Sequence, residues 1–213
     1  MTNRLGLVEV SVLAQKQARL HSEIVTILFE NRRYIKTIFL DIHGLYEIAH
    51  VGLTIIDPSA DLVVFSSTPN IEYNLIQQNL WRNDPCFSPS IQNNHELSWW
   101  NDHKITSDLE KIKLKNNQLT EGLTISRQIN DFYLLYSFAT RSKRVDLRAY
   151  YASNLFGLLD LGDYFYKSIR SIYSSYCKTI ALPELGDLTS RVSTINNSAK
   201  LRLIANNSII RGE

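Results

Sequence analysis

The chain has 213 residues, of which 44% are hydrophobic, and its formal net charge is +2, which fits one sizeable globular domain with a short appendage. A charge this close to neutral gives no electrostatic reason to expect binding to nucleic acid or to a membrane surface. Two cysteines, with no signal peptide expected and no run of roughly 18 uncharged apolar residues, predict a cytoplasmic protein without a disulfide framework or a transmembrane helix.

The first part of the chain predicts two amphipathic helices. Apolar residues recur at helical spacing from Leu13 to Leu28, which predicts a helix over about residues 10–31. A second apolar series runs from Tyr34 to Leu45, and Gly44 is expected to help end this second helix.

The hydrophobic period then changes from helical to extended. Residues 51–56 and 62–67 are rich in β-branched and apolar side chains, and the segment 57–61 between them contains a proline typical of a turn. We therefore expect a β-hairpin, followed by a helix with Asn70 as its N-cap that ends near Asn79.

The middle of the chain is predicted to be a loop followed by a solvated helix. Residues 82–104 carry two prolines and an Asn-Asn pair, which are typical of loops. The charged segment 108–117 is expected to form a helix, and the lysines of the run Lys111–Lys115 are expected to face water.

The last part predicts a second hairpin and a long helix. Residues 123–128 and 132–140 are apolar segments separated by an Asn-Asp pair, which favours a tight turn. A helix is expected over residues 145–177, with Gly157 and Gly162 bending or breaking it.

This order of elements predicts the fold class. Hairpins separated by helices favour an α/β (α+β) fold: an α-β-α sandwich with a central antiparallel sheet, like sensor domains of the PAS or GAF kind. A change of composition at Pro183 predicts a sensor domain over residues 8–178 and a short C-terminal tail over residues 179–213.

Three polar residues could line one small-molecule pocket. The carboxylate of Asp84 can accept from an amide N–H, the indole of Trp99 can donate, and the hydroxyl of Thr124 can do either. Each also has a plain structural interpretation, as a turn cap before Pro85, as a core side chain and as an ordinary strand residue. 

The sequence contains no phosphate-binding glycine loop, nucleophile elbow or zinc-protease motif, so we expect a non-enzymatic ligand sensor without a cofactor. His95 and His103 share the predicted loop, but they lack the tight spacing of metal ligands, so no metal site is expected.

Several short motifs occur in an order that resembles a known family. The chain resembles the autoinducer-binding domain of LuxR-type quorum-sensing regulators over about residues 8–176. The motifs that carry the resemblance are Ser66–Pro69, Asp84-Pro85, Trp99, Gly122-Leu123-Thr124 and Leu135–Phe138.

The resemblance implies a function and roles for particular residues. It implies an α-β-α sandwich that binds an acyl-homoserine lactone between the sheet and one helical layer. Asp84 would accept a hydrogen bond from the amide N–H of the ligand, and Trp99 would pack on its head group. Thr124 and Ser137 would reach the amide carbonyl or a substituent on the acyl chain.

The chain departs from the family pattern at the predicted pocket wall. Ile71 and Leu75 stand where the family has a Trp and a Tyr that donate hydrogen bonds to the ligand carbonyls. Losing two donors to buried carbonyls would cost about 1–3 kcal/mol each. The resemblance therefore implies a more apolar wall, with Tyr73 as the nearest remaining donor.

A second departure concerns DNA. The family continues into a helix-turn-helix domain, but the 30 residues after Pro183 are too few for one. Because a lone recognition helix lacks the scaffold that holds it in the major groove, we expect no sequence-specific DNA binding.

Two functional hypotheses follow from the sequence. The first is a regulatory sensor of an acyl-homoserine lactone or another small acyl ligand, acting as a homodimer or as a heterodimer with a LuxR-type regulator. The alternative is a ligand-independent protein-interaction module, an anti-activator, with the same fold and a filled pocket. An open apolar cavity would favour the first hypothesis and a filled interior the second.

Overall fold

The computed structural model describes residues 18–87, 97–102 and 106–185. Its contacts divide the chain into one unit from Met1 to Leu182 and a second from Pro183 to Glu213.

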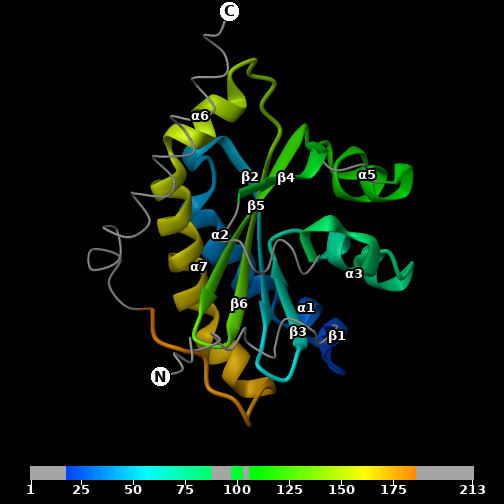
Figure 1. The fold of residues 1–213 in the computed structure, drawn as a ribbon, viewed down its shortest axis with the longest axis vertical. Helices are drawn as coiled ribbons and strands as arrows, with labels where there is room; N and C mark the ends of the chain where they lie inside the picture. The colour runs from blue at the N-terminus through cyan, green and yellow to red at the C-terminus, as the bar shows by residue number, and fades with distance from the viewer. Residues whose placement is uncertain (1–17, 88–96, 103–105, 186–213) are drawn as a thin grey trace, which may run out of the picture. The chain divides into compact units, whose positions relative to one another are not determined.

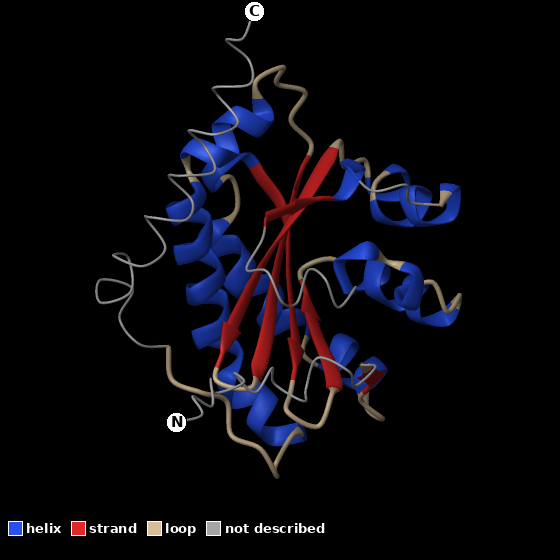
Figure 2. Cartoon of the chain, viewed as in Figure 1, coloured by secondary structure: helices blue, strands red, loops and turns tan. Residues whose placement is uncertain are grey.

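A six-stranded sheet forms the centre of the first unit, with the strand order β1-β3-β2-β6-β5-β4 (Figures 1 and 2). All neighbouring strands are antiparallel except β1 and β3, which are parallel. The strands are β1 Arg19–Leu20, β2 Ile48–Ile56, β3 Asp61–Ser66, β4 Leu97–Trp99, β5 Glu121–Ile129 and β6 Phe132–Thr140.

Helices cover both faces of the sheet, and Figure 1 shows the two helical layers on either side of the strands. One layer contains α2 Arg32–Ile42, α6 Leu147–Ser153 and α7 Leu155–Tyr176. The other contains α1 Ile24–Glu30, α3 Pro69–Gln77 and α5 Ser107–Lys113. The predicted α-β-α sandwich with a central sheet is therefore confirmed.

The two predicted hairpins form for the expected local reasons. In the β2–β3 turn, the Asp57 carboxylate accepts the backbone N–H groups of Ser59 and Asp61 at 2.8 and 2.9 Å. In the β5–β6 turn, Asn130 adopts a φ of 52°, a conformation that asparagine tolerates better than most residues.

The two faces of the sheet differ in chemistry because side chains alternate along each strand. The face toward α2 and α7 is apolar and includes Leu53, Phe65 and Phe138, which are at most 1% exposed. The opposite face carries more polar side chains, and one glycine, Gly52, lies among them. The polar residues are His50, Thr54, Ser66, Ser98, Thr124, Ser126 and Ser137.

Helix α7 is fixed to the apolar face by two polar contacts at Asp163 and by close packing. The Asp163 carboxylate accepts the Tyr136 hydroxyl at 2.7 Å and also pairs with the Arg127 guanidinium. Burial and the neighbouring Asp163 carboxylate raise the pKa of Tyr136 well above its ordinary value, so its hydroxyl stays a donor.

Several predicted element bounds were wrong. The helix expected over residues 10–31 begins only at Ile24, because Arg19 and Leu20 pair with β3 and Arg19 forms an ion pair with Asp61. Residues 10–17 of that prediction lie outside the described residues. Strand β4 lies within the segment predicted as a loop, and the N-cap of α3 is Thr68 rather than Asn70.

The long helix predicted over residues 145–177 is two helices that meet at Asn154, not at a glycine. The glycines of α7 permit close packing instead. A Cβ at Gly157 would lie 2.1 Å from the Tyr46 hydroxyl, and one at Gly162 would lie 2.2 Å from the Tyr136 ring. Among the described helices, none combines the length and the apolar character that a bilayer crossing requires.

A buried polar cluster as the candidate functional site

A buried ion pair lies between the polar face of the sheet and the α3–α5 layer. Lys113 Nζ lies 2.8 Å from Asp84 Oδ2, and both side chains are 5% exposed or less. The same ammonium lies 3.7 Å from Cys86 Sγ and 4.2 Å from the centre of the Trp100 ring. It therefore contacts an anion, a thiol and an aromatic face at once.

Local structure places the two charges opposite each other. Asp84 follows the 3-10 turn Trp81–Asn83 and precedes Pro85, and its Oδ1 accepts the Cys86 backbone N–H at 3.0 Å. It therefore does cap its turn, and its second oxygen is left for Lys113.

Lys113 is the last residue of α5, one helical turn after the fully buried Leu109. The prediction that the lysines of this segment face water was wrong for Lys113, which is 4% exposed. Burial by itself would lower the pKa of Lys113, but the adjoining Asp84 carboxylate raises it, and the net direction is upward. The ammonium therefore stays charged in the interior.

A hydroxyl network forms the floor of the site. The Trp100 indole N–H donates to Thr124 Oγ1 at 3.0 Å, and that hydroxyl lies 3.2 Å from Ser137 Oγ and 3.4 Å from Cys86 Sγ. A Cβ at Gly122 would lie 2.2 Å from the Trp100 ring, so the glycine lets the indole lie flat on β5. Burial, more than any neighbour, raises the pKa of Cys86 to about 12, and its sulfur is a protonated thiol.

Trp99, the predicted pocket residue, lies on the other face of the sheet. Its ring stacks on Tyr151 with a centroid distance of 6.0 Å, and the Arg148 guanidinium lies 4.9 Å from its centre. Trp100 occupies the place that the sequence interpretation gave to Trp99. Trp99 ends β4 and Trp100 begins a 3-10 turn, and the two rings lie on opposite sides of the sheet. Because the sequence predicts a loop here, the alternation of side chains along a strand could not be used to place them.

The structure brings most of the other predicted site residues together. Ile71 and Leu75 of α3 are buried and line the same small space as Asp84 and Ser137. Tyr73 points elsewhere and packs edge-on against Phe29 with a centroid distance of 5.4 Å. The residues that sequence reasoning missed are Lys113, Trp100, Glu72 and His50.

Two further ionisable residues belong to the cluster. Burial lowers the pKa of His50 to about 3, and the positive charge of Lys113 acts in the same direction, so the imidazole is neutral. Burial raises the pKa of Glu72 to about 7, although the nearby Lys113 opposes this shift. At neutral pH, the carboxyl of Glu72 is therefore divided between its protonated and ionised forms.

The space enclosed by these side chains is only about 20 Å³. Pockets for small molecules typically have roughly 300–1,000 Å³, whereas about 10–15 Å³ is enough for one water molecule. The interior is therefore filled. The lining residues are Gly52, Thr54, Val64, Ile71, Glu72, Leu75, Asp84, Cys86, Phe87, Trp100, Lys113, Leu135 and Ser137.

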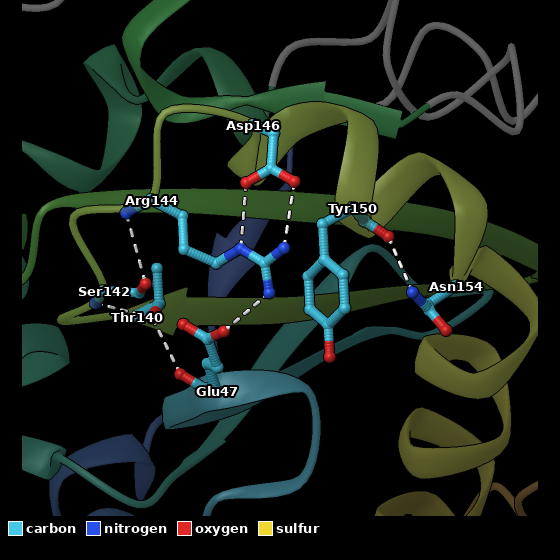
Figure 3. Close-up of polar contacts among 7 residues, drawn as sticks. All are labelled: Glu47, Thr140, Ser142, Arg144, Asp146, Tyr150 and Asn154. Atoms are coloured by element: carbon cyan, nitrogen blue, oxygen red, sulfur yellow. Dashed lines mark hydrogen bonds and ion pairs between the residues drawn. The ribbon is translucent and has the colours of Figure 1, made fainter.

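A second polar cluster, shown in Figure 3, holds α6 against the end of the sheet. Arg144 donates two hydrogen bonds of 2.9 Å to Asp146 and one of 3.0 Å to Glu47, and its guanidinium lies 4.3 Å from the Tyr150 ring centre. Thr140 Oγ1 donates to the Glu47 carbonyl at 2.7 Å. Because these contacts fix α6, they also hold its Tyr151 against Trp99.

The structure also has a polar surface hollow of about 230 Å³, which contains none of the predicted site residues. It is lined by Ala49, Thr68, Asn116, Asn117, Gln118, Leu119 and Arg141. Within the described ranges, no group of three or more His, Cys, Asp or Glu side chains could hold a metal ion. His95 and His103 lie outside these ranges, and Cys86 and Cys177 are both buried free thiols.

The chain matches no protein-family model and no curated protein. Among solved structures, it is similar to SdiA of Escherichia coli, with 14% identity over 84% of each chain and a TM-score of 0.46. It is also similar to SdiA in complex with octanoyl-rac-glycerol, with 14% identity over 87% of this chain and 80% of that one and a TM-score of 0.47. The N-acylhomoserine lactone dependent LuxR family transcription factor CepR2 of Burkholderia cenocepacia has 9% identity over 74% of this chain and 99% of its own, with a TM-score of 0.47. Likenesses this low carry no functional argument.

Proposed function

We propose that the chain is a non-enzymatic regulatory domain that acts by binding another protein and needs no ligand to stay folded. The observation that supports this proposal is the Asp84–Lys113 ion pair at the centre of a filled pocket. The carboxylate that would accept a ligand amide already accepts an ammonium. This favours the ligand-independent module of the two hypotheses drawn from the sequence.

The free energies of the two competing interactions also favour the ligand-independent module. A hydrogen bond between a ligand amide and the Asp84 carboxylate would contribute about 1.5–3 kcal/mol. Separating Lys113 from Asp84 in the interior would cost about 3–5 kcal/mol, because each charge would be left buried without its partner. An acyl ligand would also have to displace packed side chains, since only about 20 Å³ is free. Binding of that kind is therefore unfavourable.

Thermal shift measurements test the ligand-independent part of the proposal. The probes are short-chain and long-chain N-acyl-homoserine lactones and octanoyl glycerol, with CepR2 as the positive control for the lactones. We expect the Tm of this chain to stay constant at all probe concentrations. A ligand that binds the folded state raises stability with the logarithm of its concentration, and such a rise would contradict the proposal.

We further propose that the partner is a second copy of this chain or a LuxR-type regulator, and that the chain works in the cytoplasm without binding specific DNA sequences. Sedimentation of the chain alone, and of the chain mixed with CepR2 as a representative regulator, tests the association. A chain that stays monomeric in both samples would contradict this part.

A duplex-binding assay of the chain alone should give no sequence-dependent shift.

A second candidate function is the ligand sensor, and one observation favours it. Thr124 and Ser137 present two linked hydroxyls on the sheet floor, where the family resemblance implies ligand contacts. A small polar ligand that moved α3 away from the sheet could reach them. The same thermal shift series separates the two functions, because a sensor must gain stability with at least one probe.

A further inference from the structure

The polar face of the sheet carries a buried histidine, His50, that has no hydrogen-bond partner among the described residues. His50 is 1% exposed, and neither of its ring nitrogens contacts a donor or an acceptor among the described residues. A buried polar group without a partner is costly, and such groups are normally paired with protein or with an internal water. The surroundings of His50 therefore need an explanation.

A gap over Gly52 lies directly beside this histidine. Gly52 is in the middle of β2, between Ser66 of β3 and Ser137 of β6. A Cβ built on it would lie 3.4 Å from His50 Nε2, 3.7 Å from Glu72 Oε1 and 3.6 Å from the Ser137 Cβ. Two polar atoms that do not bond each other thus converge on the bare backbone of one glycine.

We propose that Gly52 keeps open a binding site for one internal water molecule, which joins His50 Nε2 to the carboxyl group of Glu72. The chamber beside Gly52, Glu72 and Ser137 has about 20 Å³, which is enough for one water and too little for a larger ligand. Much of the lining is apolar, but the part beside Gly52 carries the Glu72 carboxyl group, and His50 Nε2 lies close to the same glycine. A buried water needs two or more polar partners of this kind.

The chemistry of the two side chains fits one bridging water. A neutral imidazole presents either an N–H or a lone pair at Nε2, and water can accept from the first or donate to the second. The same water can donate to the Glu72 carboxylate, or accept from its protonated form. The site therefore stays satisfied in both protonation states of Glu72, whose pKa of about 7 makes both states accessible.

The test compares the wild-type protein with Gly52→Ala. The added methyl fits at ordinary contact distances but takes the room of the water. If the site holds water, its loss lowers Tm by roughly 2–4 °C, as expected for one lost buried hydrogen-bonding site in a chain of this size. If the gap is dry, the alanine fills it and removes a flexible glycine from a strand, so Tm rises and the proposal is wrong.

Two further measurements test directly whether a water occupies this site. A high-resolution crystal structure should have a water peak within hydrogen-bond distance of both His50 Nε2 and Glu72 Oε1, and this peak should be missing in Gly52→Ala. An empty space in the wild type would overturn the proposal. In a His50→Phe background, where no nitrogen needs a partner, Gly52→Ala should no longer lower Tm. An undiminished loss there would also count against the water.

Discussion

Asp84 and Lys113 lie 29 residues apart in the sequence, yet their side chains form a buried ion pair with an oxygen to nitrogen distance of 2.8 Å. This pair links the turn before Cys86 to the end of α5. It also fills the centre of the space between the sheet and its helical cover. The turn before Cys86 and helix α5, which both cover the polar face, are therefore joined by this ion pair.

Lys113→Met tests how much this pair holds together. The variant leaves the Asp84 carboxylate buried without its counter-ion, which should lower the free energy of unfolding by about 3–5 kcal/mol. Urea unfolding followed by tryptophan fluorescence measures the loss.

Lys115→Met is the matched control for Lys113→Met. Lys115 pairs with Glu110 at 3.1 Å on the surface, so its loss should cost at most about 1 kcal/mol. The double variant Asp84→Asn/Lys113→Met removes both charges and should recover part of the stability. If Lys113→Met and Lys115→Met lower the free energy of unfolding equally, the buried ion pair does not stabilise the contact between the Asp84 turn and α5.

Glu72 predicts an unusual dependence of stability on pH. Its pKa is about 7 in the folded protein and 4.5 ordinarily, so between these values the folded state holds a proton that the unfolded state has released. Its contribution to stability is therefore complete below pH 4.5 and is lost as the pH rises to 7. Because the side chain is partly accessible, we expect a loss on the order of 1–3 kcal/mol.

Glu72→Gln isolates this effect, because the variant cannot lose a proton. Its stability relative to wild type should rise between pH 4.5 and pH 7, as measured by urea unfolding at several pH values. The exposed Glu23→Gln is the control and should have no comparable rise. His50 acts in the opposite direction, since its lowered pKa adds stability as the pH rises from about 3 to 6.5. A flat difference for Glu72→Gln would show that its carboxyl is not desolvated.

The layers of the fold could be predicted from the sequence, because hydrophobic period and turn residues encode them locally. The strand at Arg19 could not, since it exists only through its pairing with Asp61 of β3. The burial of Lys113 was hidden for a similar reason. Its neighbours Lys111 and Lys115 made it look like one more residue of a solvated run, and its partner Asp84 is far away in the sequence.

Trp100→Phe tests which tryptophan belongs to the polar site. The variant removes the indole N–H that donates to Thr124 at 3.0 Å and leaves space against Gly122, so we expect a loss of about 1–3 kcal/mol. Trp99→Phe keeps an aromatic ring against Tyr151 and should cost less, about 0.5–1.5 kcal/mol. Chemical denaturation of both variants measures the two costs. The reverse order would place Trp99, and not Trp100, at the structural centre of the site.

Gly162→Ala separates two explanations for a glycine inside α7. If helix propensity dominated, alanine would stabilise the helix by up to about 1 kcal/mol. In the structure, however, the new methyl would lie 2.2 Å from the Tyr136 ring, whose hydroxyl is held by Asp163 at 2.7 Å. The ring cannot move away without breaking that buried hydrogen bond, so overpacking should prevail and lower the free energy of unfolding by about 1–3 kcal/mol.

The exposed Ser174→Ala on the same helix is the control, and helix propensity alone should make it slightly stabilising. Thermal and urea unfolding of both variants decide the matter, and a stabilising Gly162→Ala would mean that α7 does not approach β6 as closely as described.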